Sequence, residues 1–240
     1  MDYRDPVAKL FRVVETNIDG TKLASAVVVD LDGNRRYDLV VKDTDGRLRA
    51  WMNKPDGWKE DPTSLPDPDL PVNAYSFSGT NSAGHLDLLV SVLKGKPEST
   101  LENSFLKFVY WYPWPKPAAV ARLFRRGSSG GWQDVTATAF PKGIPWAYRK
   151  VEPITWIDVN SDGHLDFVWS GYPHPRHSMN RLYLNQGDGT FVDGIRTHIK
   201  WLPGRIYPEG TDVGDLDGDG DVDLFAYGYP FINNNGIFRQ

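Results

Sequence analysis

The acidic stretch near the C-terminus reads Asp215-Leu216-Asp217-Gly218-Asp219-Gly220-Asp221-Val222-Asp223, with a carboxylate at every second position. It continues directly into the apolar run Leu-Phe-Ala. Carboxylates packed this densely repel one another unless a cation lies among them. A hard cation such as Ca²⁺ takes about 6–8 oxygen ligands at ~2.3–2.6 Å, often from carboxylates. The stretch therefore predicts a metal-binding loop that leads into a β-strand.

Two further stretches repeat this spacing. Residues 158–166 read Asp-Val-Asn-Ser-Asp-Gly-His-Leu-Asp, and residues 30–38 read Asp-Leu-Asp-Gly-Asn-Arg-Arg-Tyr-Asp. A degenerate copy at 79–87 keeps the closing aspartate but lacks the first and fifth oxygen ligands. An EF-hand would need a Glu at loop position twelve, where these loops have Val41, Trp169 and Ala226. The copies therefore indicate calcium loops of another kind.

A second element follows each loop. Residues 182–191 read Leu-Tyr-Leu-Asn-Gln-Gly-Asp-Gly-Thr-Phe, and residues 48–58 show the same order of apolar run, Asn/Gly turn and apolar run. Weaker versions lie at 121–135 and 231–238. Such a turn between apolar runs is the strongest short-range hairpin signal. Each unit thus indicates a four-stranded antiparallel sheet, which is the blade of a β-propeller.

Four such units span the 240 residues as a single all-β domain, approximately at 11–62, 70–140, 148–200 and 205–240. We expect them to form either a closed four-bladed ring or part of a larger propeller. Blades of a propeller pack face to face and need large apolar side chains between them. We therefore expect the tryptophans of the strands to pack between blades, namely Trp51, Trp58, Trp132 and Trp169.

The composition is that of a globular protein with short strands and many turns, with 13% aromatic residues, 23 Gly and 18 Pro. Cysteine is absent from the sequence, which excludes disulfides and thiolate catalysis. No basic stripe indicates nucleic-acid binding, and no apolar run reaches the ~20 residues of a membrane-spanning helix. The first residues lack the pattern of a signal peptide. Composition leaves compartment and oligomeric state open.

These motifs resemble the FG-GAP/VCBS repeat family, whose blades carry D-x-[DN]-x-D-G-x-x-D-L loops and L-Y-x-N-x-G-D-G-T-F hairpins. The resemblance covers most of the chain, from about Phe11 to Arg239. The copies at 158–191 and 215–238 match best, whereas the copy at 30–58 has Arg35 where glycine is usual. The resemblance implies a β-propeller with calcium in its loops, as in integrin α-subunit heads, and it favours an extracellular protein.

The oxygen donors of each loop follow from its spacing. Positions one, three, five and nine offer side chains, position seven offers a backbone carbonyl, and water completes the shell. Oxygen-only donors suit Ca²⁺ or Mg²⁺ rather than a transition metal. We expect two to three structural calcium ions with these ligands: Asp30, Asp32, Asn34, Arg36 and Asp38; Asp158, Asn160, Asp162, His164 and Asp166; Asp215, Asp217, Asp219, Asp221 and Asp223.

A possible ligand face lies away from these loops. In a four-stranded meander the acidic loops and the hairpin turns share one end of each blade, and the variable loops lie at the other end. Long loops on a rigid scaffold commonly carry binding sites, and exposed tryptophans stack on sugar rings or anchor protein partners. We expect this ligand face to include Trp111, Trp114, Trp146, His174 and Trp201.

Three functions fit such a face. A non-catalytic module would bind carbohydrate or protein there, which is the interpretation we favour. A sugar-active lyase or dehydratase would use His174, Arg176 or His177 as acid or base, although no nucleophile–base motif accompanies these residues. A purely structural propeller would serve within a larger assembly.

Overall fold

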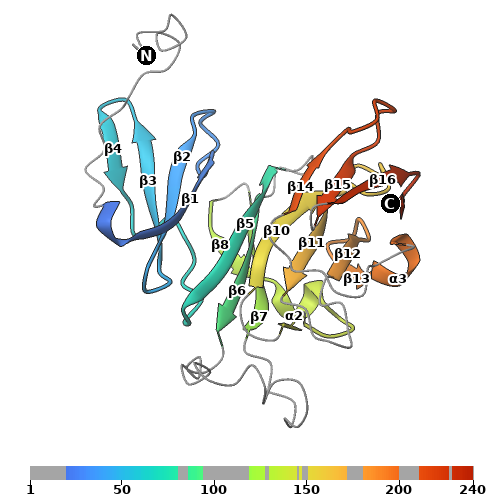
Figure 1. The fold of residues 1–240 in the computed structure, drawn as a ribbon. Coiled ribbons are helices and arrows are strands. Elements are labelled where there is room, and N and C mark those ends of the chain that lie inside the picture. The colour runs from blue at the N-terminus through green and yellow to red at the C-terminus, as the bar shows by residue number, and fades with distance from the viewer. Residues whose placement is uncertain are drawn as a thin grey trace, which may run out of the picture.

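The computed structural model describes residues 20–80, 86–93, 119–127, 130–144, 146–147, 151–171, 181–199, 211–226 and 229–239. These residues form four antiparallel sheets in chain order, which we call blades 1 to 4 (Figure 1). The helices described are short: η2 (Gly20–Lys22), α2 (Thr136–Ala139) and α3 (Ile195–His198). The all-β class expected from the repeats is therefore confirmed.

Each blade is a meander in which consecutive strands pair. Blade 1 contains β1 (Leu23–Val29), β2 (Asp38–Asp43), β3 (Leu48–Lys54) and β4 (Gly57–Glu60). Blade 2 contains β5 (Val72–Thr80), β6 (Leu86–Leu93), β7 (Ala119–Arg126) and β8 (Trp132–Asp134), with β9 (Trp146–Ala147) added beside β7. Blade 3 contains β10 (Val151–Ile157), β11 (Asp166–Gly171), β12 (Arg181–Asn185) and β13 (Phe191–Asp193). Blade 4 contains β14 (Thr211–Gly214), β15 (Asp223–Ala226), β16 (Tyr229–Asn234) and β17 (Ile237–Arg239).

The core lies between the blades because successive side chains of a strand point to opposite faces of its sheet. In β6, Leu88 and Val90 join a cluster that includes Leu48 of blade 1, whereas Leu89 joins a cluster with blade 3. The second cluster is aromatic, and its Phe167 and Tyr183 rings stack with centroids 5.0 Å apart. A third cluster joins blades 3 and 4. Each blade is therefore stabilised by its neighbour.

The two ends of a blade differ in what they carry. The backbone N–H of Asn235, in the turn between β16 and β17, donates to the Asp221 carboxylate of the acidic loop at 3.1 Å. At the opposite end of blade 1, Val72 N donates to the carbonyl of Gly46, in the turn between β2 and β3, at 2.8 Å. In these two blades the acidic loop and the hairpin turn thus share one end, and the second turn lies at the other.

The first strands of blades 2, 3 and 4 are neighbours, since β10 contacts both β5 and β14. Blades 1 and 4 lie at opposite ends of the arc that the four sheets form (Figure 1). The arrangement is that of a propeller or of part of one. In the described part of the chain, no helix is long and apolar enough to span a membrane.

The strand tryptophans lie on different faces of their blades. Trp169 is buried in the cluster of blades 2 and 3, and Trp132 packs between blades 1 and 2. Trp51 differs, because it pairs with Leu39 on the face of blade 1 that points away from blade 2. For Trp51 the expected site between two blades stays a prediction.

Candidate metal centre

The aspartate that closes each acidic loop is fully buried at the start of the second strand of its blade: Asp38, Asp166 and Asp223. One carboxylate oxygen of each accepts a hydrogen bond from the second residue of its own loop: Leu31 N at 2.9 Å, Val159 N at 3.0 Å and Leu216 N at 2.6 Å. The other oxygen accepts one from the third strand: Asn53 N at 2.8 Å, Asn185 N at 2.7 Å and Asn233 N at 2.7 Å. Three blades thus use one carboxylate to join the loop to the third strand.

The three asparagines repeat a second contact that sequence reasoning missed. Their Nδ2 groups donate to the carbonyl of the residue before the closing aspartate: Tyr37 at 3.3 Å, Leu165 at 3.2 Å and Val222 at 3.1 Å. The sequence pattern alone places these asparagines in the hairpin turn. The signal was present in the sequence, because each asparagine ends an apolar run at the same place in the repeat.

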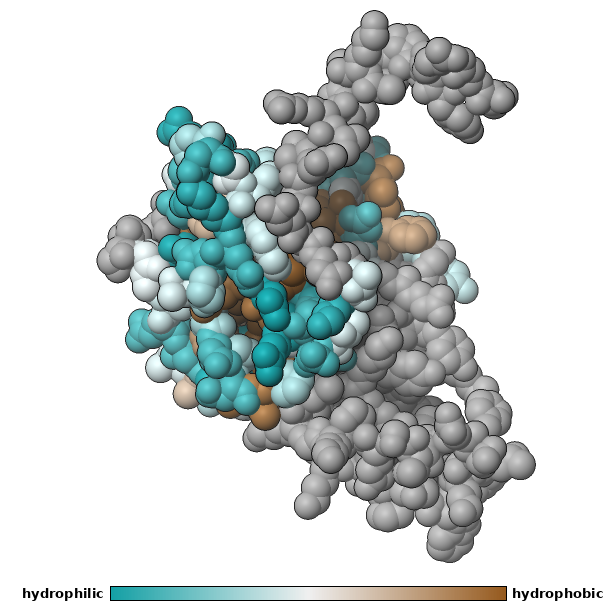
Figure 2. All heavy atoms as spheres, turned by 90° about the vertical axis from the view of Figure 1, so that its left-hand side faces the viewer, coloured by the Kyte–Doolittle hydropathy of each residue, from teal (hydrophilic) through white to brown (hydrophobic). Residues whose placement is uncertain are grey.

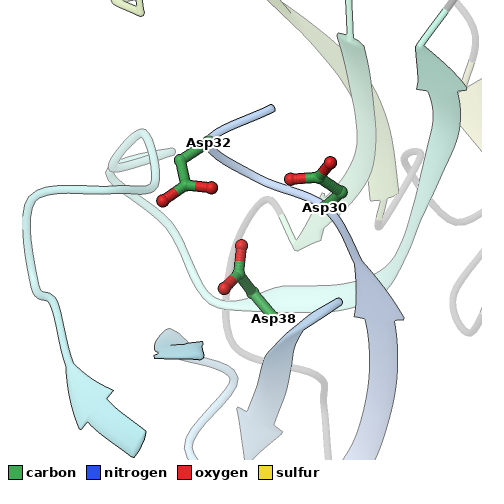
Figure 3. Close-up of side chains that lie close together, drawn as sticks. All are labelled: Asp30, Asp32 and Asp38. Atoms are coloured by element: carbon green, nitrogen blue, oxygen red, sulfur yellow. The ribbon is translucent and has the colours of Figure 1, made fainter. Parts of the chain in front are cut away.

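Carboxylates converge in two of the loops, which we number by blade. In loop 1 (residues 30–38), oxygens of Asp30, Asp32 and Asp38 all lie within 4.8 Å of one another. Figure 3 shows these three side chains pointing into a common space. In loop 4 (residues 215–223) the equivalent Asp215, Asp217 and Asp223 meet the same criterion. Positions one, three and nine of these loops therefore form a group that could hold a cation.

The backbone of each loop wraps around its first aspartate. Asp30 accepts hydrogen bonds from the N–H groups of Gly33, Asn34 and Arg35, at 2.8, 3.1 and 2.8 Å. Asp215 accepts in the same way from Gly218 at 2.7 Å and Gly220 at 3.2 Å. This wrapping requires left-handed backbone at loop positions four and six, where φ is 76° and 65° in loop 1 and 83° and 95° in loop 4. The first aspartate of each loop is therefore held in place by the backbone of its own loop.

Position seven was expected to offer a carbonyl. Its N–H donates to the side chain at position five in each loop: Arg36 to Asn34 at 2.8 Å, His164 to Asp162 at 2.8 Å, and Asp221 to Asp219 at 2.9 Å. These bonds fix the peptide at position seven without involving its carbonyl oxygen. The role of the position-seven carbonyls of Arg36, His164 and Asp221 as ligands stays a prediction.

Loops 1 and 4 differ in electrostatics. In loop 1, Lys54 Nζ lies 2.8 Å from Asp32. Burial opposes the shift, but this hydrogen bond and that from Asn34 lower the pKa of the Asp32 carboxyl. In loop 4, desolvation and then the neighbouring Asp219 raise the pKa of Asp217. In the described part of the chain no lysine or arginine pairs with the loop 4 carboxylates. Loop 4 is therefore the one with the larger uncompensated negative charge.

Loop 3 (residues 158–166) has fewer carboxylates at the converging positions. Position three is Asn160, whose Nδ2 donates to Asp162 at 2.9 Å, so the three-carboxylate group of loops 1 and 4 does not form. Burial, followed by the charges of Asp162 and Asp158, raises the pKa of Asp166 to about 6. The loop still offers oxygen donors, but its amide leaves it less acidic than loop 4.

Blade 2 has a different partner for its closing aspartate. Asp87 is buried, and Arg125 on the adjacent strand β7 binds both of its oxygens, Nε at 2.8 Å and Nη2 at 2.7 Å. The hydrogen bond to Asp87 raises the pKa of the Arg125 guanidinium further. Where the loop has lost its first and fifth oxygen ligands, the protein therefore supplies the cation from its own chain. Sequence reasoning identified the degenerate loop but not this arginine.

The donor set of loops 1 and 4 fits a hard divalent cation. It consists of oxygens, most of them from carboxylates, and the closing aspartate of loop 4 accepts hydrogen bonds from two backbone N–H groups. Each carboxylate oxygen has two lone pairs, so an oxygen that accepts one hydrogen bond can still bind a metal. Bound calcium would neutralise the repulsion within each loop and join the first and second strands of the blade.

The expected ligand face lies mostly outside the described residues. This holds for Trp111, Trp114, His174, Arg176, His177 and Trp201. Trp146 lies in β9, although its side chain is not described. A cavity of about 300 Å³ lies beside that segment, lined by Lys142, Gly143 and Ile144 and by blade 3 residues that include Tyr183 and Asp193. It borders the connection between blades 2 and 3, where ligand contacts were expected.

Comparison with known proteins identifies the repeat. A family model described as the FG-GAP-like repeat matches residues 158–226. Among solved structures, the biofilm matrix protein Bap1 of V. cholerae aligns with a TM-score of 0.39 and 12% identity, over 90% of this chain and 30% of that one. A protein named as a gluconolactonase aligns with a TM-score of 0.40 and 15% identity, over 84% of this chain and 58% of the other.

The chain thus spans less than two thirds of the length of either protein. No curated protein matches it. The family match includes loops 3 and 4 and the strands that follow them. Residues 158–226 therefore match the FG-GAP-like repeat, as their motifs predicted.

Proposed function

We propose that this β-rich repeat protein is a calcium-stabilised binding module. The observation that carries the proposal is the convergence of three carboxylates in loop 4, with no basic side chain paired to them among the described residues. Like charges held this close destabilise the fold unless a cation joins them. Asp215, Asp217 and Asp223 would hold the ion in loop 4, and Asp30, Asp32 and Asp38 would hold one in loop 1.

Calcium would act here on folding rather than on catalysis. Because the loop is not formed in the unfolded chain, the free energy of ion binding adds to the free energy of folding. The ligand, a carbohydrate or a protein, would bind at the opposite ends of the blades. The cavity beside Lys142 and the position of Trp146 at the same connection support this choice of face.

Thermal melts with added calcium and with a chelator test the structural role. We expect the melting temperature to rise with calcium and the rise to shrink in Asp217→Asn, which removes one carboxylate that makes no contact with the third strand. Asp45→Asn is the matched control, because Asp45 is an exposed aspartate in a turn outside the loops. A melting temperature that does not respond to calcium would contradict the proposal.

A glycan array tests the ligand face. We expect binding by the wild type, loss of binding in Trp111→Ala/Trp114→Ala, and retention in a His174→Ala/His177→Ala variant. Turnover of a bound sugar that disappears in the histidine variant would instead indicate a lyase or dehydratase. The absence of any glycan signal, together with no captured protein partner, would contradict a binding module and favour a structural propeller.

A further inference from the structure

A continuous path of hydrogen bonds joins the closing aspartates of loops 3 and 4. Val159, the second residue of loop 3, donates its N–H to Asp166 at 3.0 Å. The carbonyl of Val159 accepts a hydrogen bond from Nδ2 of Asn233, in β16 of blade 4, at 2.8 Å. The N–H of Asn233 in turn donates to Asp223, which closes loop 4, at 2.7 Å. Two buried carboxylates in neighbouring blades are thus linked through two residues, which are themselves fully buried.

The side chain of Asn233 is held on all sides. The second hydrogen of its Nδ2 group is donated to the carbonyl of Val222, beside the closing aspartate, at 3.1 Å. Its Oδ1 accepts a hydrogen bond from the N–H of Gly236, in the turn between β16 and β17, at 2.9 Å. Every polar atom of this side chain therefore has a partner. Buried networks whose members are all satisfied are rigid, so Asn233 cannot shift without breaking the path.

Further contacts join the same two loops nearer the surface. Ser161 Oγ of loop 3 lies 3.5 Å from a carboxylate oxygen of Asp221 in loop 4. The other oxygen of Asp221 accepts a hydrogen bond from the N–H of Asn235 at 3.1 Å. The next residue, Gly236, packs against position three of loop 3, because a Cβ placed on it would lie 3.5 Å from the Cβ of Asn160. Loops 3 and 4 therefore meet in one contiguous junction.

Among the described residues, loop 1 has no such connection to a second acidic loop. It belongs to blade 1, at the opposite end of the arc from blade 4, and Figure 2, which looks onto that end, shows a mostly hydrophilic surface there. The carbonyl of Leu31, the second residue of loop 1, accepts a hydrogen bond from Arg126 of blade 2. In blade 2 the closing Asp87 is paired with Arg125. The contact of loop 1 therefore leads to a blade whose aspartate already has a cation of the chain.

We propose that Asn233 is a positioning residue that couples calcium binding in loops 3 and 4, an inference that rests on the proposed role of calcium. Without an ion, repulsion within the three-carboxylate group of loop 4 opposes the position of Asp223 to which Asn233 donates. Relief of that repulsion holds Asp223 in place, and through Asn233 it holds the Val159 peptide that donates to Asp166. Loop 3 is then partly ordered before its own ion binds. A site that is already ordered binds its ligand more tightly, because less conformational entropy is lost.

Repulsion between the two ions acts in the opposite direction but does not reverse the sign. A cation in loop 4 lowers the attraction of that loop for a second cation nearby. Loop 4 carries five aspartates, however, so it keeps a net negative charge at neutral pH with one calcium ion bound. Most of the loop is exposed, and exposed charges are screened beyond about 8 Å at physiological ionic strength. We therefore expect positive coupling, which should weaken as the salt concentration is lowered.

Calcium titrations followed by NMR test the coupling, because one glycine amide donates to the first aspartate of each loop and reports on it: Gly33 in loop 1, Gly163 in loop 3 and Gly220 in loop 4. Asp217→Asn lowers the affinity of loop 4 and should also weaken calcium binding in loop 3 about tenfold. Asp162→Asn in loop 3 should weaken binding in loop 4 by the same factor, since coupling between two sites is reciprocal. The affinity of loop 1 should not change in either variant.

Asn233→Ala removes the link itself while keeping the N–H that donates to the closing aspartate. In this background, Asp217→Asn should no longer change calcium binding in loop 3. Asn185→Ala is the matched control, because Asn185 makes the corresponding contacts within blade 3, to Leu165 O and from Gly187 N, but reaches no neighbouring loop among the described residues. It should change the affinity of loop 3 at most, and the tenfold coupling should remain.

A second measurement needs no change at Asn233, in case Asn233→Ala does not fold. In Asp162→Asn, calcium in loop 4 should slow hydrogen exchange of the Val159 amide more than that of the Asn53 amide, which serves loop 1. Equal exchange effects, or loop 3 affinities that do not respond to Asp217→Asn, would overturn the coupling and leave the structural role of calcium intact. Coupling that persists in a folded Asn233→Ala would overturn the role of Asn233. Absence of calcium binding would overturn both the coupling and the proposed function.

Discussion

The buried aspartate at the start of the second strand has different partners in blades 2 and 4. Asp87 and Asp223 both begin the second strand of a blade, and both are buried. Asp87 is paired with Arg125, whereas Asp223 lies against a loop with four further aspartates and no paired basic residue among those described. A buried carboxylate needs a positive partner or hydrogen-bond donors. In blade 2 the chain itself therefore supplies a cation for this aspartate, where we propose that calcium serves the acidic loop of blade 4.

Removal of the internal cation should have the largest effect. We expect Arg125→Met to destabilise the protein by about 3–5 kcal/mol, because it leaves a buried carboxylate unpaired. Calcium should not restore the loss, since loop 2 lacks the ligands. Urea unfolding with calcium and with chelator measures both points. Lys59→Met, which removes an exposed pair with Asp56, should cost much less stability.

A double variant tests whether the unpaired buried charge causes this loss of stability. In Asp87→Leu/Arg125→Met the buried charge is removed together with its partner, and most of the lost stability should return, as for other buried pairs replaced by apolar residues. If Arg125→Met unfolds no more easily than Lys59→Met, the guanidinium is not the cation on which blade 2 depends.

Removal of the closing carboxylate of blade 4 should rank second. Asp223→Asn leaves one of two N–H donors, the part-buried Leu216 or the buried Asn233, without an acceptor, at a cost of about 1–3 kcal/mol. It should also reduce the stabilisation by calcium. Asp217→Asn is the contrast, because it leaves these hydrogen bonds intact and removes repulsion, so it should stabilise the calcium-free protein and weaken the response to calcium. Equal losses in both variants would contradict the separation of these roles.

The sequence was informative wherever structure is local. Loop spacing, the following strand and the hairpin turn depend on residues that are close in the chain, and they identified the four sheets and the converging carboxylates of loops 1 and 4. Side-chain contacts between strands were harder to predict from the sequence. Arg125 reaches Asp87 across 38 residues, and nothing in the local pattern indicates which face of β7 it occupies. The same limit applies to Trp51, since strand alternation does not say which face has a neighbour.

A fall in pH should change the stability of the calcium-free protein and the stabilisation by calcium in opposite directions. The folded pKa of Asp166, about 6, lies above its usual value of 3.8, so the folded state holds this proton more tightly than the unfolded chain. In chelator, Asp166 should therefore add stability as the pH falls through about 6 towards 4. Calcium needs the ionised carboxylate, so the increase in melting temperature that it causes should shrink over the same range. Melts at several pH values, with and without calcium, test both signs.

The smallest expected effects concern the backbone of the loops. Position six is Arg35 in loop 1 with φ 65°, but Gly220 in loop 4 with φ 95°. A left-handed non-glycine residue costs about 1–2 kcal/mol, partly offset by the greater freedom of glycine in the unfolded chain. Arg35→Gly should therefore stabilise the protein by about 0.5–1 kcal/mol, and Gly220→Ala should destabilise it by a similar amount.

Steric clashes do not complicate this comparison, because a Cβ at Gly220 would meet no atom within 4 Å. Ser161→Gly is the control for charge. It relieves a φ of 56° at position four of loop 3 without removing a basic residue from an acidic site. If Arg35→Gly destabilises the protein while Ser161→Gly stabilises it, the positive charge of Arg35 outweighs its backbone strain. Loop 1 would then resemble blade 2, with basic side chains of the chain itself doing part of what we propose for calcium in loop 4.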